Sequence, residues 1–307
     1  MTYASPVSQS GSLRHWLADP HPTSPFQARM HQSWRMWRKL RRNGSALLGL
    51  AILFVIVIAA VFAPLLSTHD LFAQDLGNRL SLPSAEHWFG TDELGRDIYS
   101  RLLYGARITL YIAALTAVIS APVGLVVGAV SGYFGGWIDT VLMRVTEVFL
   151  AFPSLILALA FVSALGPGIN NAIIAISLTA WPPIARLARA ETMIIRRSDY
   201  ISVVRLQGAS ALRIITRHVM PMCVPSVIAR VTLNMASIIL SAAGLGFLGL
   251  GAQPPSPEWG AMLSSARQFI LSNGFVAAAP GMAILLTSIA FNLVGDGLRD
   301  VLDPRHD

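Results

Sequence analysis

The residues that could do chemistry gather first in one basic stretch, SDYISVVRLQGASALRIITRHVMP, at residues 198–221. Its arginines and its histidine lie between two long apolar runs, and hydrocarbon would solvate them poorly. They are Arg205, Arg213, Arg217 and His218. A cationic surface of this kind suits contact with another molecule, and an acidic partner groove would complement it. The stretch therefore favours docking over catalysis.

The same stretch predicts two short helices joined at Gly208. On a helical net two sets of three residues fall on different faces. The apolar face holds Leu212, Ile215 and Val219, and the polar face holds Ser210, Arg213 and Arg217. Only glycine takes positive φ angles without strain, which suits a bend at this position. A plain surface connector on the bilayer remains the alternative.

Nucleotide hydrolysis and intramembrane proteolysis find no support in the residues. A phosphate-binding loop of the Walker A type needs a lysine in a glycine-rich context, whereas Lys39, the single lysine, stands between Arg38 and Leu40. An intramembrane serine protease needs a histidine beside its serine, and every histidine lies outside the apolar runs. We therefore predict that the chain is not an enzyme and has no catalytic residues.

The composition predicts an integral membrane protein. Hydrophobic residues make up 54% of the 307, charged residues 13%, and the mean hydropathy is +0.58. The net charge of +7 does not indicate nucleic acid, because the arginines stand between apolar runs. The one cysteine, Cys223, excludes an intrachain disulfide framework and a multi-cysteine metal cage. We expect no metal and no cofactor on this chain, and membrane lipid as its surroundings.

Six apolar runs are long enough, or nearly so, to cross a bilayer as helices. They lie near residues 46–66, 108–130, 145–165, 169–188, 220–248 and 275–296. We expect Trp181-Pro182-Pro183 to kink the fourth run or to end its helix early. The predicted fold class is an all-α polytopic membrane protein with about six transmembrane helices.

Lysine and arginine predict the orientation, because short cytoplasmic loops retain positive charge. A basic cluster in residues 29–42 precedes the first run, and residues 67–105 carry an acidic excess. Seven arginines fall in residues 186–217. We therefore expect both termini and the basic stretch to be cytoplasmic, and residues 67–105 to be external.

Two polar or small-residue patterns lie within the runs. Gly124, Gly128, Gly132 and Gly136 repeat every four residues, and such a stripe lets helices approach closely in lipid. We expect Gly124 and Gly128 to pack against another span. Another set follows one face of the fifth run and marks our candidates for a translocation path, with helix–helix hydrogen bonding as the alternative. These are Asn234, Ser237 and Ser241.

The basic stretch resembles the cytoplasmic coupling loop of ATP-binding-cassette (ABC) importer permeases. The residues that carry the likeness are Asp199, Tyr200, Gly208, Ala209, Ser210, Arg213, Arg217 and Pro221. Three further segments resemble the second-type permease subunit of dipeptide, oligopeptide and nickel importers. They are HWFGTDELGRDIYSRLLYGARITL (87–110), GLGFLGLGAQPPSPEWGAML (244–263) and FNLVGDGLRDVLDPR (291–305).

This resemblance implies a type I importer permease fold in a bacterial inner membrane. It further implies a homologous second permease, two cytoplasmic ATPases that bind ATP and magnesium, and an external solute-binding protein. Within residues 87–110 it points to a motif in the external segment. The motif consists of Gly90, Asp92, Gly95, Arg96 and Asp97.

The expected organisation has three parts. A polar tail occupies residues 1–34, and residues 35–105 hold an interfacial helix, the first span and the external segment. Residues 106–307 form a core of five spans, with the coupling loop at 190–221. The predicted function is that of a permease subunit in an ATP-driven importer of a peptide-like solute or nickel chelate. A secondary-active transporter or channel is the alternative.

Overall fold

The computed structural model describes residues 24, 30, 34 and 37–302. Most of the predicted polar tail, residues 1–34, thus lies outside the described residues. The described part is built of helices, and its one strand-like feature is an isolated bridge between Thr91 and Asp97. The prediction of an all-α protein is confirmed.

The helices run in chain order, with short 3₁₀ turns at Leu76–Asn78 and Arg267–Phe269. The first six are α3 (Gly44–Val61), α4 (Ala63–Leu66), α5 (Ile98–Phe134), α6 (Gly136–Leu150), α7 (Ser154–Leu165) and α8 (Ile169–Ile195). The last five are α9 (Asp199–Leu206), α10 (Ala211–Ile214), α11 (Met220–Phe247), α12 (Trp259–Ala266) and α13 (Phe275–Leu302). A π-helical turn at Ile215–Val219 joins α10 to α11.

Four stretches of helix in the described residues are long and apolar enough to cross a membrane. They are α3, α5, the continuous helix from α10 through α11, and α13. A fifth crossing results if α6 and α7, which meet at 91°, form one broken span. This set agrees roughly with the six predicted runs, but the run at 145–165 is bent instead of straight, because the chain turns between α6 and Ser154 after Pro153.

Helix α8 does not end at its two prolines, contrary to the expectation of an early stop. It continues through Pro182 and Pro183 to Ile195. Proline removes backbone donors, but neighbouring helices can hold such a segment helical in a membrane protein. Here α5 packs closely on α8 on both sides of the proline pair, as the glycine contacts show.

Glycines of α5 lie against α8. A Cβ atom added at Gly124 would lie 2.7 Å from the Cβ of Ile184, and one at Gly132 would lie 2.8 Å from the Cβ of Thr192. A Cβ at Gly128 would meet the backbone oxygen of Ala185. Gly136 lies beyond the turn that ends α5 and has open space around it. Three of the four glycines in the sequence stripe therefore face one helix.

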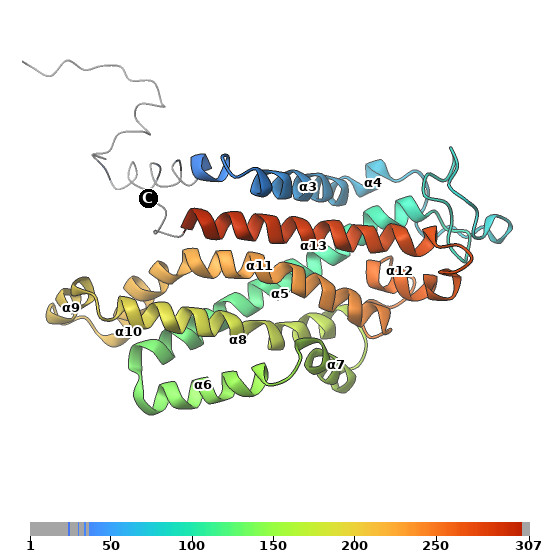
Figure 1. Ribbon diagram of the computed structural model, residues 1–307. Helices are drawn as coiled ribbons and strands as arrows, with labels where there is room; N and C mark the ends of the chain where they lie inside the picture. Colours follow the sequence, from blue (N-terminus) through green and yellow to red (C-terminus); the bar gives the residue numbers. More distant parts are fainter. Residues whose placement is uncertain (1–23, 25–29, 31–33, 35–36, 303–307) are drawn as a thin grey trace, which may run out of the picture.

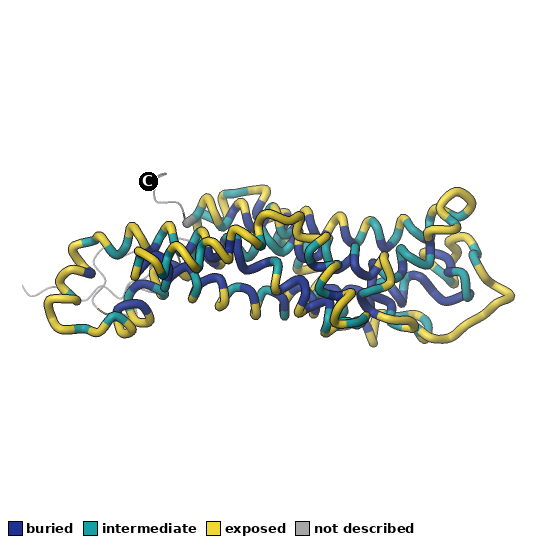
Figure 2. Tube along the Cα trace, turned by 90° about the horizontal axis from the view of Figure 1, so that it is seen from below, coloured by how far each residue is buried: buried dark blue, intermediate teal, exposed yellow. Residues whose placement is uncertain are grey.

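The helices lie side by side in an elongated bundle with distinct ends (Figure 1). Helices α9 and α10 project at one end, whereas α12 and the segment between α4 and α5 lie at the other. Buried residues follow the inside of the bundle, and exposed residues cover its outside and much of both ends (Figure 2). The two ends carry the features considered next.

Candidate functional site

The first candidate site is the α9–α10 tip, which we define as residues 199–214. Ser198 precedes α9, and Gly208 turns the chain with a φ of +81° before α10 begins. Ser210 caps α10, because its Oγ accepts a hydrogen bond from the backbone N of Arg213 at 3.4 Å. Nothing lies within 4 Å of a Cβ built at Gly208. The glycine is thus required by the backbone angle and not by crowding.

Two details of the tip differ from the sequence prediction. The second helix is not separate, because α10 passes through the π-helical turn into α11 without a break. Leu212 does not share the buried face of Ile215 and Val219, since it is 71% exposed. A π turn holds more residues than an α turn and so shifts the phase of the helical faces, which a regular net misses.

The inner side of the tip is anchored in a hydrophobic cluster. Ile201 of α9 and Ile214 of α10 are buried against residues of α5, α8 and α11, including Tyr133 and Ile184. The hydroxyl of Tyr200 also lies 2.6 Å from Nδ1 of His218, which ties α9 to the π-helical turn. A force on the tip would therefore reach three long helices directly.

The outer side of the tip exposes apolar side chains. Leu206 is 88% exposed and Leu212 71%, and Tyr200 and Val203 are exposed as well. Contiguous apolar surface at one end of a protein marks an interaction site when no other segment of the chain covers it. This surface, with a rim of arginines, is suited to a groove on a soluble partner.

The structure brings the predicted coupling residues together at this end. Ala209 is half-buried, Gly208 forms the bend, and Pro221 lies in the first turn of α11. The remaining predicted polar residues point outward and are exposed. They are Asp199, Tyr200, Ser210, Arg213 and Arg217.

One ion pair near the same end was missed in the sequence. Arg189 of α8 donates to both carboxylate oxygens of Asp139 in α6, from Nε at 2.5 Å and from Nη2 at 2.6 Å. Ser131 of α5 also donates to Asp139. Bidentate pairs of this kind are directional and link their elements firmly. Because 50 residues separate the partners, no local pattern reveals them.

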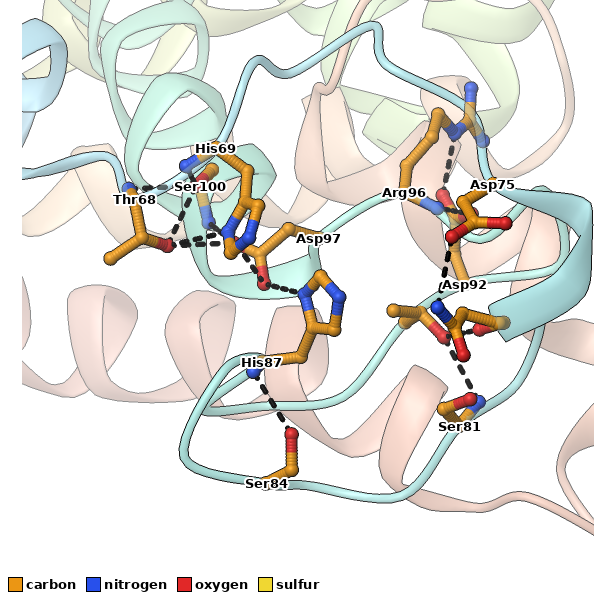
Figure 3. A network of polar contacts seen from close by, with 12 residues as sticks. Thr68, His69, Asp75, Ser81, Ser84, His87, Asp92, Arg96, Asp97 and Ser100 are labelled. Carbon is orange, nitrogen blue, oxygen red and sulfur yellow. Dashed lines mark hydrogen bonds and ion pairs between the residues drawn. The ribbon is translucent and has the colours of Figure 1, made fainter.

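The second candidate site, at the opposite end, is the 90–97 turn, which leads into α5. Gly90 and Gly95 have φ angles of +75° and +72°. Asp92 accepts hydrogen bonds from the backbone N of Arg96 at 3.0 Å and from its Nε at 2.7 Å. Asp97 caps α5 by accepting from the backbone N of Ser100 at 2.7 Å (Figure 3). All five predicted motif residues thus form one compact structure.

A buried glutamate near α12 joins the second site to the segment at 244–263. Glu258 caps α12 by accepting from the backbone N of Gly260 and of Ala261, each at 2.9 Å. Burial raises the pKa of the Glu258 carboxyl, although these two donors oppose the rise. The next residue, Trp259, donates from Nε1 to the backbone oxygen of Leu102 in α5 at 3.0 Å. Two of the segments that carried the family resemblance therefore contact each other.

The predicted path residues lie along α11, away from both sites. Ser237 is exposed, and Asn234 and Ser241 are half-buried. Within residues 37–302 their side chains have no hydrogen-bond partner on another helix. The face that carries them is left for a neighbour or for water.

Residues 124–307 match the family described as binding-protein-dependent transport system inner membrane component. Residues 32–83 match the N-terminal transmembrane domain of oligopeptide transport permease C. These two matches together cover most of the chain.

Several named relatives align with nearly the whole chain. It is 43% identical to the dipeptide transport system permease protein DppC of Alkalihalophilus pseudofirmus, with 94% of this chain and 96% of the relative covered. It is 44% identical to the glutathione transport system permease protein GsiD of Escherichia coli, covering 88% and 89%. A probable D,D-dipeptide transport system permease protein, DdpC of Escherichia coli, is 40% identical, covering 91% and 93%.

The fold also resembles a solved structure. An inward-facing form of the MetNI methionine ABC transporter aligns with a TM-score of 0.54 and 19% sequence identity. The alignment covers 66% of this chain and 97% of the transporter chain. At this identity the likeness concerns the fold alone.

Proposed function

This chain belongs to the family of binding-protein-dependent transport system inner membrane components, and we propose on that premise that it carries a peptide-like solute. It is a permease subunit of an ATP-driven importer in a bacterial inner membrane, and a transport subunit rather than an enzyme. Such an importer includes an ATPase and a solute-binding protein. The remaining proposals concern where the chain meets these partners and what passes.

The ATPase docks on the α9–α10 tip. The observation that carries this proposal is the tip's two-sided burial: an exposed apolar outer side with Leu206 and Leu212, and an inner side anchored on α5, α8 and α11. Rigid-body movement of a partner can be transmitted through an element packed in this way. ATP and magnesium are bound by the partner ATPases, and this chain supplies the mechanical contact.

A homologous second permease completes the translocation path against α11. The polar face with Asn234, Ser237 and Ser241 supports this arrangement, because its side chains have no partner in the described part of this chain. Polar side chains within a membrane face a protein interface or a water-filled cavity. The basic stretches support an orientation with both termini and the tip in the cytoplasm.

The proposed solute is a dipeptide or a similarly small peptide. This class rests on the names of relatives at 40–44% identity, which refer to dipeptides, glutathione and D,D-dipeptides. A main-chain amide bond and charged termini are common to these solutes. Selection among them falls to the solute-binding protein.

Uptake into proteoliposomes tests the proposal. The permease is reconstituted with its second permease, ATPases and binding protein, and a labelled dipeptide is offered outside. We expect accumulation only with ATP inside, and competition by unlabelled dipeptides and glutathione. Accumulation driven by a proton or sodium gradient without ATP would instead support a secondary carrier. ATP-dependent uptake of another solute class, with no competition by peptides, would overturn the proposed cargo.

A further inference from the structure

Two histidines and a carboxylate come together beside the 90–97 turn. Nδ1 of His87 lies 3.0 Å from Oδ1 of Asp97, and Nδ1 of His69 lies 3.9 Å from the same oxygen. One ligand atom from each of the three residues lies within 4.8 Å of the others. Their side chains converge from three separate stretches of chain in Figure 3. We propose that His69, His87 and Asp97 bind one Zn²⁺ ion.

The distances suit a tetrahedral ion after a small adjustment. Ligand atoms about 2.0–2.1 Å from zinc in a tetrahedral site lie ~3.3 Å from one another. The observed separations of 3.0 and 3.9 Å fall on either side of that value. The ion would replace the proton that His87 and Asp97 share, and closing the remaining gap requires less than about 1 Å of movement by His69.

Surrounding groups already orient these ligands. The second carboxylate oxygen of Asp97 accepts from the backbone N of Ser100 at 2.7 Å, which turns Oδ1 toward the histidines. Oγ of Ser100 accepts from the backbone N of Thr68 at 3.2 Å and from that of His69 at 3.1 Å. Oγ of Ser84 accepts from the backbone N of His87 at 3.0 Å. Support of this kind around the ligands is typical of metal sites.

The donor set and its exposure select the ion. Two imidazoles with one carboxylate favour zinc or a similar transition metal, whereas calcium and magnesium prefer oxygen ligands. The Asp97 side chain is fully buried, while the side chains of His69 and His87 are 32% and 15% exposed. An ion can therefore enter from solvent, and water can fill the fourth position. The bound ion would fasten residues 68–87 to the first turn of α5.

The sequence analysis predicted no metal on this chain, because it considered only cysteine-based sites. The histidines are 18 positions apart in the sequence, and Asp97 follows ten positions after His87. No short motif joins them, and the loop that brings them together has no periodic pattern. The inference therefore rests on the folded geometry and goes beyond the proposed transport function.

Zinc titration of the assembled transporter tests the proposal. The complex carries a tag without histidine, is stripped with a chelator, and is titrated with Zn²⁺ and separately with Co²⁺. We expect one more bound ion per permease than in the His87→Asn complex, a higher unfolding temperature with Zn²⁺, and the visible absorption of tetrahedral Co²⁺. An equal number of ions in wild type and His87→Asn would overturn the proposal.

Conservative variants separate metal binding from a structural hydrogen bond. In His69→Asn and His87→Asn the amide can still hydrogen-bond to Asp97 but binds zinc poorly, so affinity should fall at least about tenfold. The matched control His218→Asn, at the opposite end, should keep the ion. Retained binding in both cluster variants contradicts the proposal. If those variants fail to assemble, His69→Cys decides: it restores a zinc ligand, so one bound Co²⁺ with thiolate absorption supports the site and no bound ion refutes it.

Discussion

Gly128→Leu is expected to lower the amount of assembled permease several-fold. A Cβ at this position would meet the backbone oxygen of Ala185 and would lie 2.7 Å from the Cβ of Ala188. Backbone atoms of α8 have no rotamer to change, so the two helices must separate. Overpacking of this kind costs about 1–3 kcal/mol, and close backbone approach is what holds helices together in lipid. The measurement is the yield of intact complex after gentle detergent extraction and size-exclusion chromatography.

Gly44→Leu is the matched control for this substitution. Gly44 begins α3, is exposed, and has nothing within 4 Å of an added Cβ. Its variant should assemble in wild-type amounts. If Gly128→Leu also assembles and transports at wild-type levels, the contact between α5 and α8 is looser than the structure describes, and the packing role of the glycine stripe is wrong.

Gly208→Val is expected to leave the protein in the membrane but to uncouple ATP hydrolysis from transport. The φ of +81° is strained for a β-branched residue by about 1–3 kcal/mol. Relief of this strain would redirect α9 relative to α10, and no spanning helix is altered. We expect a several-fold loss of hydrolysis stimulated by the solute-loaded binding protein. The measurement is ATPase activity in reconstituted membranes at equal permease content.

Gly208→Asn separates the backbone angle from the loss of glycine itself. Asparagine tolerates left-handed angles far better than valine, and no neighbour lies within 4 Å to obstruct its Cβ. This variant should retain most of the stimulation. Equal activity in both variants would mean that the bend is not needed for coupling, whereas equal loss in both would mean that the site needs glycine for another reason.

Much of the fold could be predicted from hydropathy, because apolar length and the positions of arginine are direct consequences of a bilayer. The bend between α6 and α7 was missed, since both halves are apolar and composition alone does not report the direction of a chain. The early end at Pro182 was also wrong. Proline's local effect was weighed without the packing of α5 against α8, which keeps the helix intact.

The candidate sites divide in a similar way. Residues close in sequence, such as Gly208 with Ser210 or Asp92 with Arg96, could be grouped beforehand because local turn chemistry brings them together. The exposure of Leu212 could not, because the π-helical turn changes the register of the faces. The pair of Asp139 with Arg189 depends on packing between distant helices, and local spacing contains no record of it.

The central claim is that the α9–α10 tip contacts the ATPase, and crosslinking tests it most directly. A photoreactive residue is placed at Leu206, which is 88% exposed, and in a separate protein at Leu271, a fully exposed leucine at the opposite end. After illumination of the assembled transporter in membranes, we predict a covalent adduct between position 206 and the ATPase, and none from position 271. An ATPase adduct from position 271 with none from position 206 would contradict both the docking site and the orientation.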